Sequence, residues 1–223
     1  GYQDASFFHD ESGFLTPTPY GDCADVLLTD AGGWLLSRYA LLLVAGEVAG
    51  GTELRDKLAA YARQGGHLVI TAGSLAHLPG GLAGLEIGCT ATLAAGTQVD
   101  MEGSILTEDC AFELCELVPA GGFGACDAGA EVPAGEATRW RVLATCAGRP
   151  AAVTARVGHG RITVLAVPFG LPARPRTQAT LASAIDAELP KPFPLLRHVR
   201  AALDSVLRTQ VLFEAGDGLS VIT

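Results

Sequence analysis

The sequence predicts an α/β protein with a parallel sheet and helices on both faces, plus an antiparallel β segment and a helical C-terminal extension. Three observations predict this fold class. Short continuous apolar runs alternate with amphipathic stretches up to residue 88, as in a parallel sheet that is buried on both faces. Short alternating runs rich in Gly and Ala follow over residues 89–147. Beyond Pro168, apolar residues recur at helical spacing.

These three hydrophobicity patterns divide the chain into three parts. We expect residues 1–88 and 148–190 to form one α/β domain, with residues 89–147 as an inserted β-rich segment. Residues 191–223 are expected to be a helix followed by the start of a truncated next domain. Because the chain begins and ends abruptly, we expect it to be a piece of a longer polypeptide.

The first part contains four expected strands, each a short apolar run bounded by turn residues. They are residues 5–9, 25–29, 40–46 and 67–72. Between the last two, apolar side chains recur at i, i+4 and i+7 and predict a helix over 52–64, with Leu54, Leu58 and Tyr61 facing the sheet. Thr52 is the expected N-cap, and the Gly65-Gly66 pair ends the helix. The strand at 40–46, the helix at 52–64 and the strand at 67–72 are therefore predicted to form a βαβ crossover.

Two hairpins and a helix are expected in the later chain. Residues 150–167 form a hairpin around Gly158-His159-Gly160, and the last two short apolar runs form another around Gly216-Asp217-Gly218. Residues 193–208 predict a helix with one apolar stripe of Leu195, Val199, Leu203 and Val206. This stripe either mediates self-association or packs on the protein's own sheet.

Composition excludes several classes of protein. The 223 residues carry a formal charge of −9, and 49% of them are hydrophobic against 17% charged, which excludes disorder. A negative chain also lacks the clustered basic residues with which proteins grip nucleic acid or anionic membrane. The most apolar window, residues 35–50, is interrupted by Arg38 and Glu47 and is too short to span a bilayer. We expect neither a nucleic-acid nor a membrane partner.

The six cysteines leave their state open. None forms a C-x-x-C pair and no histidine pair lies near them, so no metal site is expected. Four of them fall between residues 110 and 146, where disulfides and buried free thiols are equally compatible with the pattern. Glu113 and Glu116, close to two of these cysteines, are expected on a solvent face. No signal peptide is visible, and the compartment stays unknown, with secretion possible.

Candidate site residues lie where the predicted parallel strands end, because open α/β sheets bind ligands beyond the carboxyl ends of their strands. The candidate ligand-binding residues are Asp30, Glu47, Thr71 and Ser74. As catalytic candidates, Ser74 would be a nucleophile, and Glu47 with His77 an acid/base pair. The competing interpretation is structural, since a Ser after a Gly at a strand end is most often a helix N-cap. Trp34 and Trp140 are candidates for stacking on a sugar ring, against ordinary roles in a core or interface.

Two patterns carry a family resemblance. They are L-x-x-Y-x-x-x-G-G-x-L-V-I-T, ending at Thr71, and the G-x-P-A-x-V…G-x-G-R-I-x-V hairpin that begins at Gly148. Together with the strand before them, they resemble the flavodoxin-like, glutamine-amidotransferase-like domain of glycoside hydrolases, notably the trimerisation domain of family 42 β-galactosidases. Active amidotransferases of this class carry a Cys on a strand-to-helix elbow and a His after a late strand. In this chain the elbow falls at 71–74 without a Cys, and the late strand ends at Val167-Pro168-Phe169 without a His.

The resemblance therefore implies a noncatalytic accessory domain of a larger carbohydrate-active enzyme, which serves oligomer contacts or shapes a neighbouring active site. A catalytic domain in the same polypeptide and a second copy of the chain are the implied partners, with a carbohydrate as a further candidate. No cofactor is expected. Two alternatives stay open, an independent hydrolase or amidase that uses Ser74 or a cysteine, and a carbohydrate-binding module.

Overall fold

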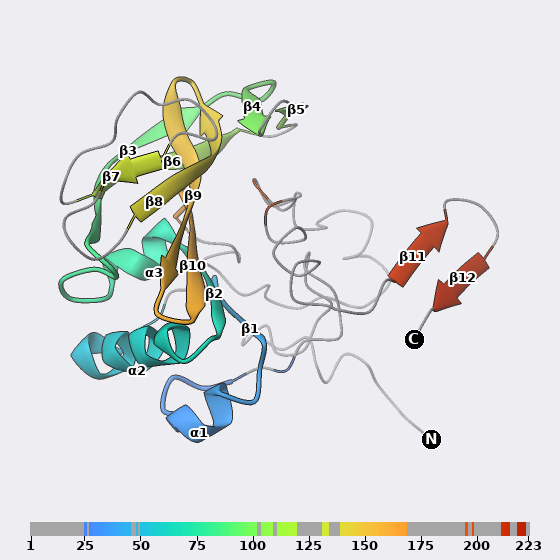
Figure 1. Ribbon diagram of the computed structural model, residues 1–223. Helices are drawn as coiled ribbons and strands as arrows, with labels where there is room; N and C mark the ends of the chain where they lie inside the picture. The colour runs from blue at the N-terminus through green and yellow to red at the C-terminus, as the bar shows by residue number, and fades with distance from the viewer. Residues whose placement is uncertain are drawn as a thin grey trace, which may run out of the picture.

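A computed structural model describes the central part of the chain and short later stretches (Figure 1). The described residues are 25, 27–45, 48, 50–101, 104–108, 111–119, 131–133, 139–168, 195, 198, 211–214 and 218–221.

The main sheet has eight strands and is mixed rather than purely parallel. Its order is β1 (Leu41–Val44), β2 (His67–Thr71), β10 (Gly160–Leu165), β9 (Arg149–Val157), β8 (Arg139–Cys146), β4 (Gln98–Met101) and β5 (Ser104–Thr107), with β7 (Glu131–Pro133) also paired to β8. The first three strands are parallel, and every later pairing is antiparallel. The predicted hairpin over 150–167 is confirmed as β9 and β10.

The predicted βαβ crossover is also confirmed. Helix α2 (Gly51–Arg63) connects β1 to its parallel neighbour β2 and buries Leu54, Leu58 and Tyr61. The prediction that Thr52 caps the helix is wrong, because Gly50 holds the N-cap position and Thr52 lies inside the first turn. A Cβ at residue 50 would collide with the Leu54 side chain, so this cap requires glycine. Gly65, with φ of 117°, ends the helix as predicted.

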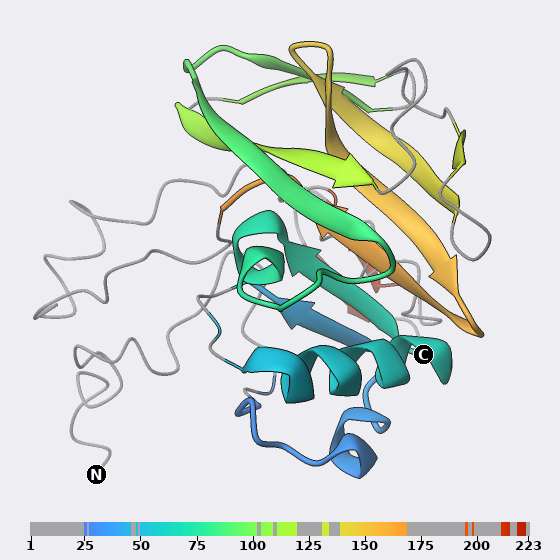
Figure 2. The same cartoon turned by 90° about the vertical axis from the view of Figure 1, so that its left-hand side faces the viewer.

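Helices on both faces of the sheet are not confirmed for the described residues. Helix α2 packs against β2 and β10, and the short helix α3 (Ala72–Ala76) lies on the same face (Figure 2). Among the described residues, β1–α2–β2 is a crossover through a single helix, whereas the connection from β2 to β10 runs through further strands of the same sheet. A third helix, α1 (Gly33–Leu36), packs against α2.

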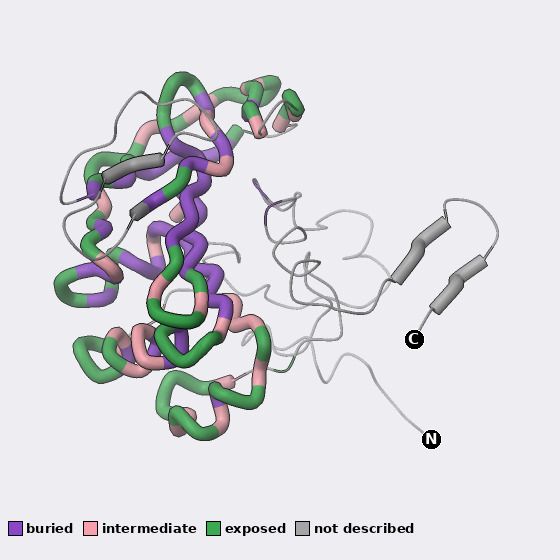
Figure 3. The backbone as a smooth tube through the Cα atoms, in the orientation of Figure 1, coloured by how far each residue is buried: buried purple, intermediate pink, exposed green. Residues whose placement is uncertain are grey.

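The segment predicted to be β-rich forms strands but not one separate sheet. Only β3 (Leu85–Leu93) and β6 (Phe112–Pro119) pair by themselves, while β4, β5, β7 and β8 extend the main sheet. In strand β6, Glu113 and Glu116 are exposed to solvent as expected, while Leu114 and Cys115 between them are both buried. By contrast, all five residues of β2 are buried (Figure 3).

The strand predicted at 25–29 is wrong, since its described residues lie in loop and turn and the Leu28 side chain is 72% exposed. A strand needs a neighbour that pairs with its backbone, and this apolar run has none among the described residues. The strand at 5–9 and nearly all of the helix at 193–208 lie outside the described residues. The final predicted hairpin is confirmed as β11 (Val211–Glu214) and β12 (Gly218–Val221). No helix in the described part of the chain could cross a membrane.

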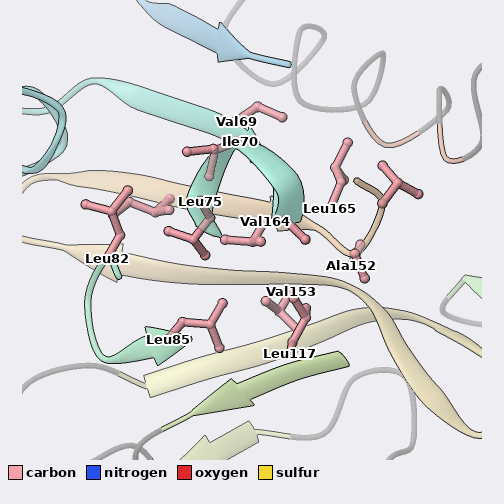
Figure 4. Close-up of a cluster of buried hydrophobic side chains, with 14 of the residues drawn as sticks. Val69, Ile70, Leu75, Leu82, Leu85, Leu117, Ala152, Val153, Val164 and Leu165 are labelled. Carbon is pink, nitrogen blue, oxygen red and sulfur yellow. The ribbon is translucent and has the colours of Figure 1, made fainter. Parts of the chain in front are cut away.

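The core lies between the main sheet, α3 and the β3–β6 pair (Figure 4). Ile70 and Val164, which are partners in register on adjacent strands, meet Leu75 of α3. Leu85 of β3 and Leu117 of β6 close the cluster from the other side. This packing joins the parallel strands to the β-rich segment and fixes the carboxyl ends of β2 and β10.

Candidate functional site

The carboxyl ends of β2 and β10 lie side by side and leave little room. Helix α3 begins directly after Thr71, without an intervening loop. The Gly73 N–H donates to the carbonyl of Val167 at 3.3 Å, so the chain leaving β10 passes over the first turn of α3. A Cβ on residue 73 would collide with the carbonyl of Pro168. Backbone therefore fills the place where an open α/β sheet would bind a ligand.

Thr71 and Ser74 bond to each other in this corner. Thr71 is the N-cap of α3, and its Oγ1 accepts from the Ser74 N–H at 3.4 Å and shares a hydrogen bond of 2.9 Å with Ser74 Oγ. The expected capping role thus belongs to Thr71, three residues before Ser74. Both residues have an exposed fraction of 0%. In this structure neither side chain is open to a ligand, which removes the geometric basis for a Ser74 nucleophile.

The other candidates do not gather around Ser74. His77 is the exposed C-cap of α3, while Ser74 points into the core. Asp30 is exposed in a turn, because the strand that was expected to end there does not form. Glu47 lies outside the described residues, so the Glu47–His77 pair stays a prediction.

The two positions that would hold catalytic groups in an amidotransferase are adjacent here. The elbow at 71–74 and the late strand end at Val167-Pro168 meet through the Gly73 to Val167 hydrogen bond. Neither carries a thiol or an imidazole, as the sequence indicated. The arrangement holds two backbone segments together and presents no side chain for nucleophilic attack or proton transfer at their point of contact.

Buried polar chemistry lies instead between β2, β10 and β9. His67 Nε2 bonds to Thr163 Oγ1 at 3.0 Å, and Thr163 Oγ1 lies 3.1 Å from Thr154 Oγ1. Thr154 in turn donates to the carbonyl of Ile162 at 3.1 Å. Burial, with a smaller contribution from the charge of Arg161, lowers the pKa of His67 to about 4. A neutral, hydrogen-bonded imidazole that is only 6% exposed is a structural group.

The described cysteines are free thiols. Cys115 and Cys146 are buried, and burial raises the pKa of each. Cys89 is exposed and its thiol donates to Glu116 Oε2 at 3.0 Å, a hydrogen bond that raises the pKa of Cys89. The described residues contain no group of His, Cys, Asp or Glu side chains arranged to hold a metal ion. Cys23, Cys110 and Cys126 lie outside the described residues.

Comparisons with known proteins give structural matches only. No family model matches the chain, and no curated protein matches it. It is similar to a β-galactosidase from the haloarchaeon Halorubrum lacusprofundi, with 19% identity over 84% of this chain and 25% of that one, at a TM-score of 0.47. It is also similar to an exo-β-1,4-mannosidase from Opitutaceae bacterium strain TAV5, with 20% identity over 59% and 21% of the two chains and a TM-score of 0.39.

A third match is a catalytic mutant of a family GH42 β-galactosidase from G. stearothermophilus, with 21% identity over 59% and 19% of the two chains and a TM-score of 0.36. The chain spans a quarter or less of the length of these three enzymes. The solved structures that it matches thus include glycoside hydrolases, at TM-scores too low to support an argument about fold or activity.

Sequence reasoning missed one surface feature. Trp34, Ser37, Lys57 and Gln64 line a hollow between α1 and α2. Lys57, Ala60, Tyr61 and Gln64 recur at i, i+3, i+4 and i+7, so their common helix face was readable from the sequence. The position of Trp34 opposite that face was not, because it depends on how α1 packs. Trp140, the other candidate for stacking, is fully buried and donates from Nε1 to the carbonyl of Ala83 at 3.3 Å.

Proposed function

We propose that this chain is a noncatalytic accessory domain of a larger carbohydrate-active enzyme, a glycoside hydrolase, in which it provides oligomer contacts or shapes the neighbouring active site. The observation that carries the noncatalytic part is the closed carboxyl edge of the sheet. There Ser74 is inaccessible, and the Val167-Pro168 backbone occupies the space over α3. A hydrolase needs a nucleophile that a substrate can reach.

The glycoside hydrolase part rests on the two sequence patterns that end at Thr71 and begin at Gly148. The structure gives these patterns a physical role. The first pattern covers the second half of α2 and all of β2, and the second pattern covers the β9–β10 hairpin. The two segments contact each other at the tip of the hairpin. The His159 N–H donates to the carbonyl of Arg63 at 3.0 Å, and a Cβ on Gly160 would collide with the carbonyls of Ala62 and Gly66. Gly160 is thus required for the packing of the hairpin on α2 and the start of β2.

Two experiments test the proposal. Assays of the isolated chain on glutamine and simple esters should detect no turnover, and Ser74→Ala should change nothing. Turnover that disappears in Ser74→Ala would contradict the noncatalytic role and favour the hydrolase alternative.

The second experiment determines the reading frame on both sides of residues 1–223. We expect it to encode a glycosidase catalytic domain, and deletion of this segment should reduce the oligomeric state or the glycosidase activity of the full-length product. A reading frame without such a domain, or a deletion that leaves both properties unchanged, would overturn the accessory role.

A further inference from the structure

In the described part of the chain, helices α1 and α2 lie at the end opposite the β-rich segment (Figures 1 and 2). Side chains of these two helices line a hollow. Its volume is about 320 Å³. Ligand pockets of proteins span about 300–1,000 Å³, so this one is at the small end and suits a compact ligand. It is distinct from the closed carboxyl edge of the sheet and shares no residue with it.

Trp34 forms one rim of the hollow with its side chain 72% exposed. Large aromatic side chains are usually well buried, as Trp140 is here. The indole ring packs against the backbone of Gly32, because a Cβ on that residue would lie 2.8 Å from both Cδ1 and Nε1 of the ring. Glycine at position 32 therefore lets the ring lie close to the backbone and leaves most of its surface to solvent.

Polar side chains from both helices also line the hollow. Lys57 Nζ donates to the carbonyl of Thr29 at 3.0 Å, which positions the ammonium, and an ammonium has two further N–H groups to offer. Gln64, also on α2, supplies an exposed amide that both donates and accepts. Ser37 Oγ donates to the carbonyl of Trp34 at 2.8 Å and still has acceptor capacity.

An exposed aromatic ring together with several hydrogen-bonding groups in one hollow is the chemistry that recognises a sugar. The face of an indole carries negative potential and attracts the C–H-rich face of a pyranose ring, while the ring hydroxyls bond to amide and ammonium groups. We propose that this hollow is a saccharide-binding subsite for one or two pyranose rings, with Trp34 as the stacking platform and Lys57 and Gln64 as hydroxyl partners. This subsite goes beyond the accessory role, because the isolated chain binds sugar whether or not a glycosidase domain precedes it.

The test is titration calorimetry of the whole chain with lactose, cellobiose and mannobiose. We expect millimolar binding of at least one disaccharide, accompanied by quenching of Trp34 fluorescence. Trp34→Ala should weaken binding at least tenfold, and Lys57→Met should weaken it less. Ile105→Ala is the matched control, since Ile105 is 66% exposed on β5 and should leave both binding and stability unchanged.

A conservative variant separates stacking from simple exposure. Trp34→Tyr should retain part of the affinity, because a smaller aromatic face still stacks. Gly32→Ala should displace the indole and weaken binding without loss of fold, which circular dichroism checks. Absence of binding to all three disaccharides, or binding that Trp34→Ala leaves unchanged, would overturn the proposal. Self-association that Trp34→Ala abolishes, in the absence of any sugar binding, would instead assign the hollow to a protein interface.

Discussion

The α/β part of the molecule (β1, β2, β10, α2 and α3) and its β-rich part (β3 to β8) differ in how many residues of a strand are buried. Every residue of β2 is buried, and helices α2 and α3 contact this strand. In β6 three residues of eight are exposed, and in β4 one residue of four is buried. A fully buried strand tolerates substitution at no position, whereas a partly buried strand tolerates it at its exposed positions. The two parts therefore differ in how much each residue contributes to stability.

The largest expected contrast is between two glycines. Gly73→Ala in α3 should lower the free energy of unfolding by roughly 3 kcal/mol or more, since the new Cβ collides with backbone that cannot rotate away. Gly96→Ala, in the turn before β4, meets no atom within 4 Å and should cost only about 1 kcal/mol from its φ of 87°. Urea denaturation of both variants measures the difference, and equal losses would mean that the edge of the sheet is open.

A second contrast compares side chains on β2 and β6. Ile70→Ala removes a fully buried side chain and should cost about 3–4 kcal/mol. Val118→Ala, at a position 42% exposed, should cost less than about 1 kcal/mol. Thermal unfolding by calorimetry gives both values. A loss at Val118 as large as that at Ile70 would show that another surface covers β6.

Acid should weaken the α/β part first. The folded state holds the pKa of His67 at about 4, against about 6.5 in an unfolded chain. Between these values the unfolded chain binds a proton that the folded chain does not, so the free energy of unfolding falls as pH decreases from 6.5 to 4, by on the order of 2 kcal/mol. Burial lowers the pKa of His198 to about 4 as well, which adds to the loss.

Hydrogen exchange locates this effect. Amides of β2 and β10 should lose protection before those of β4, because residues 85–146 contain no histidine. His67→Gln, which keeps a hydrogen-bonding group beside Thr163, should flatten the pH dependence. An unchanged pH profile in that variant would mean that other groups govern the acid response.

The smallest expected effect is a difference in thiol reactivity between Cys89 on β3 and Cys115 on β6. Iodoacetamide should label exposed Cys89 in the folded protein and leave buried Cys115 and Cys146 unmodified until the chain unfolds. Glu116→Gln removes the carboxylate that raises the pKa of Cys89 and should speed its labelling about two- to fivefold at pH 7.5. Peptide mapping by mass spectrometry distinguishes the sites. Labelling of Cys115 in the folded state would contradict its buried position in β6.

The candidate site was less predictable than the fold. The candidate residues came from the rule that ligands bind beyond the carboxyl ends of parallel strands, and the absence of a Cys at 71–74 and of a His after Val167 is plain in the sequence. That Gly73 packs against Pro168, and that Ser74 is thereby buried, depends on two segments almost 100 residues apart. The spacing of residues along the chain does not predict such a contact. A buried Ser and an accessible Ser therefore cannot be distinguished from the sequence.

The sequence by itself determined those elements that are specified by residues close together in the chain. The helix face of Leu54, Leu58 and Tyr61, its end at Gly65 and the β9–β10 hairpin all follow from short spacing rules and from the backbone freedom of glycine. Tertiary structure decided the rest. The apolar run at 25–29 is no strand, since nothing in the described chain pairs with it, and α2 and α3 lie on one face of the sheet, which no local spacing rule predicts. The physical reason is that strand pairing and packing are contacts between distant residues, and their free energy exists only once the chain has folded.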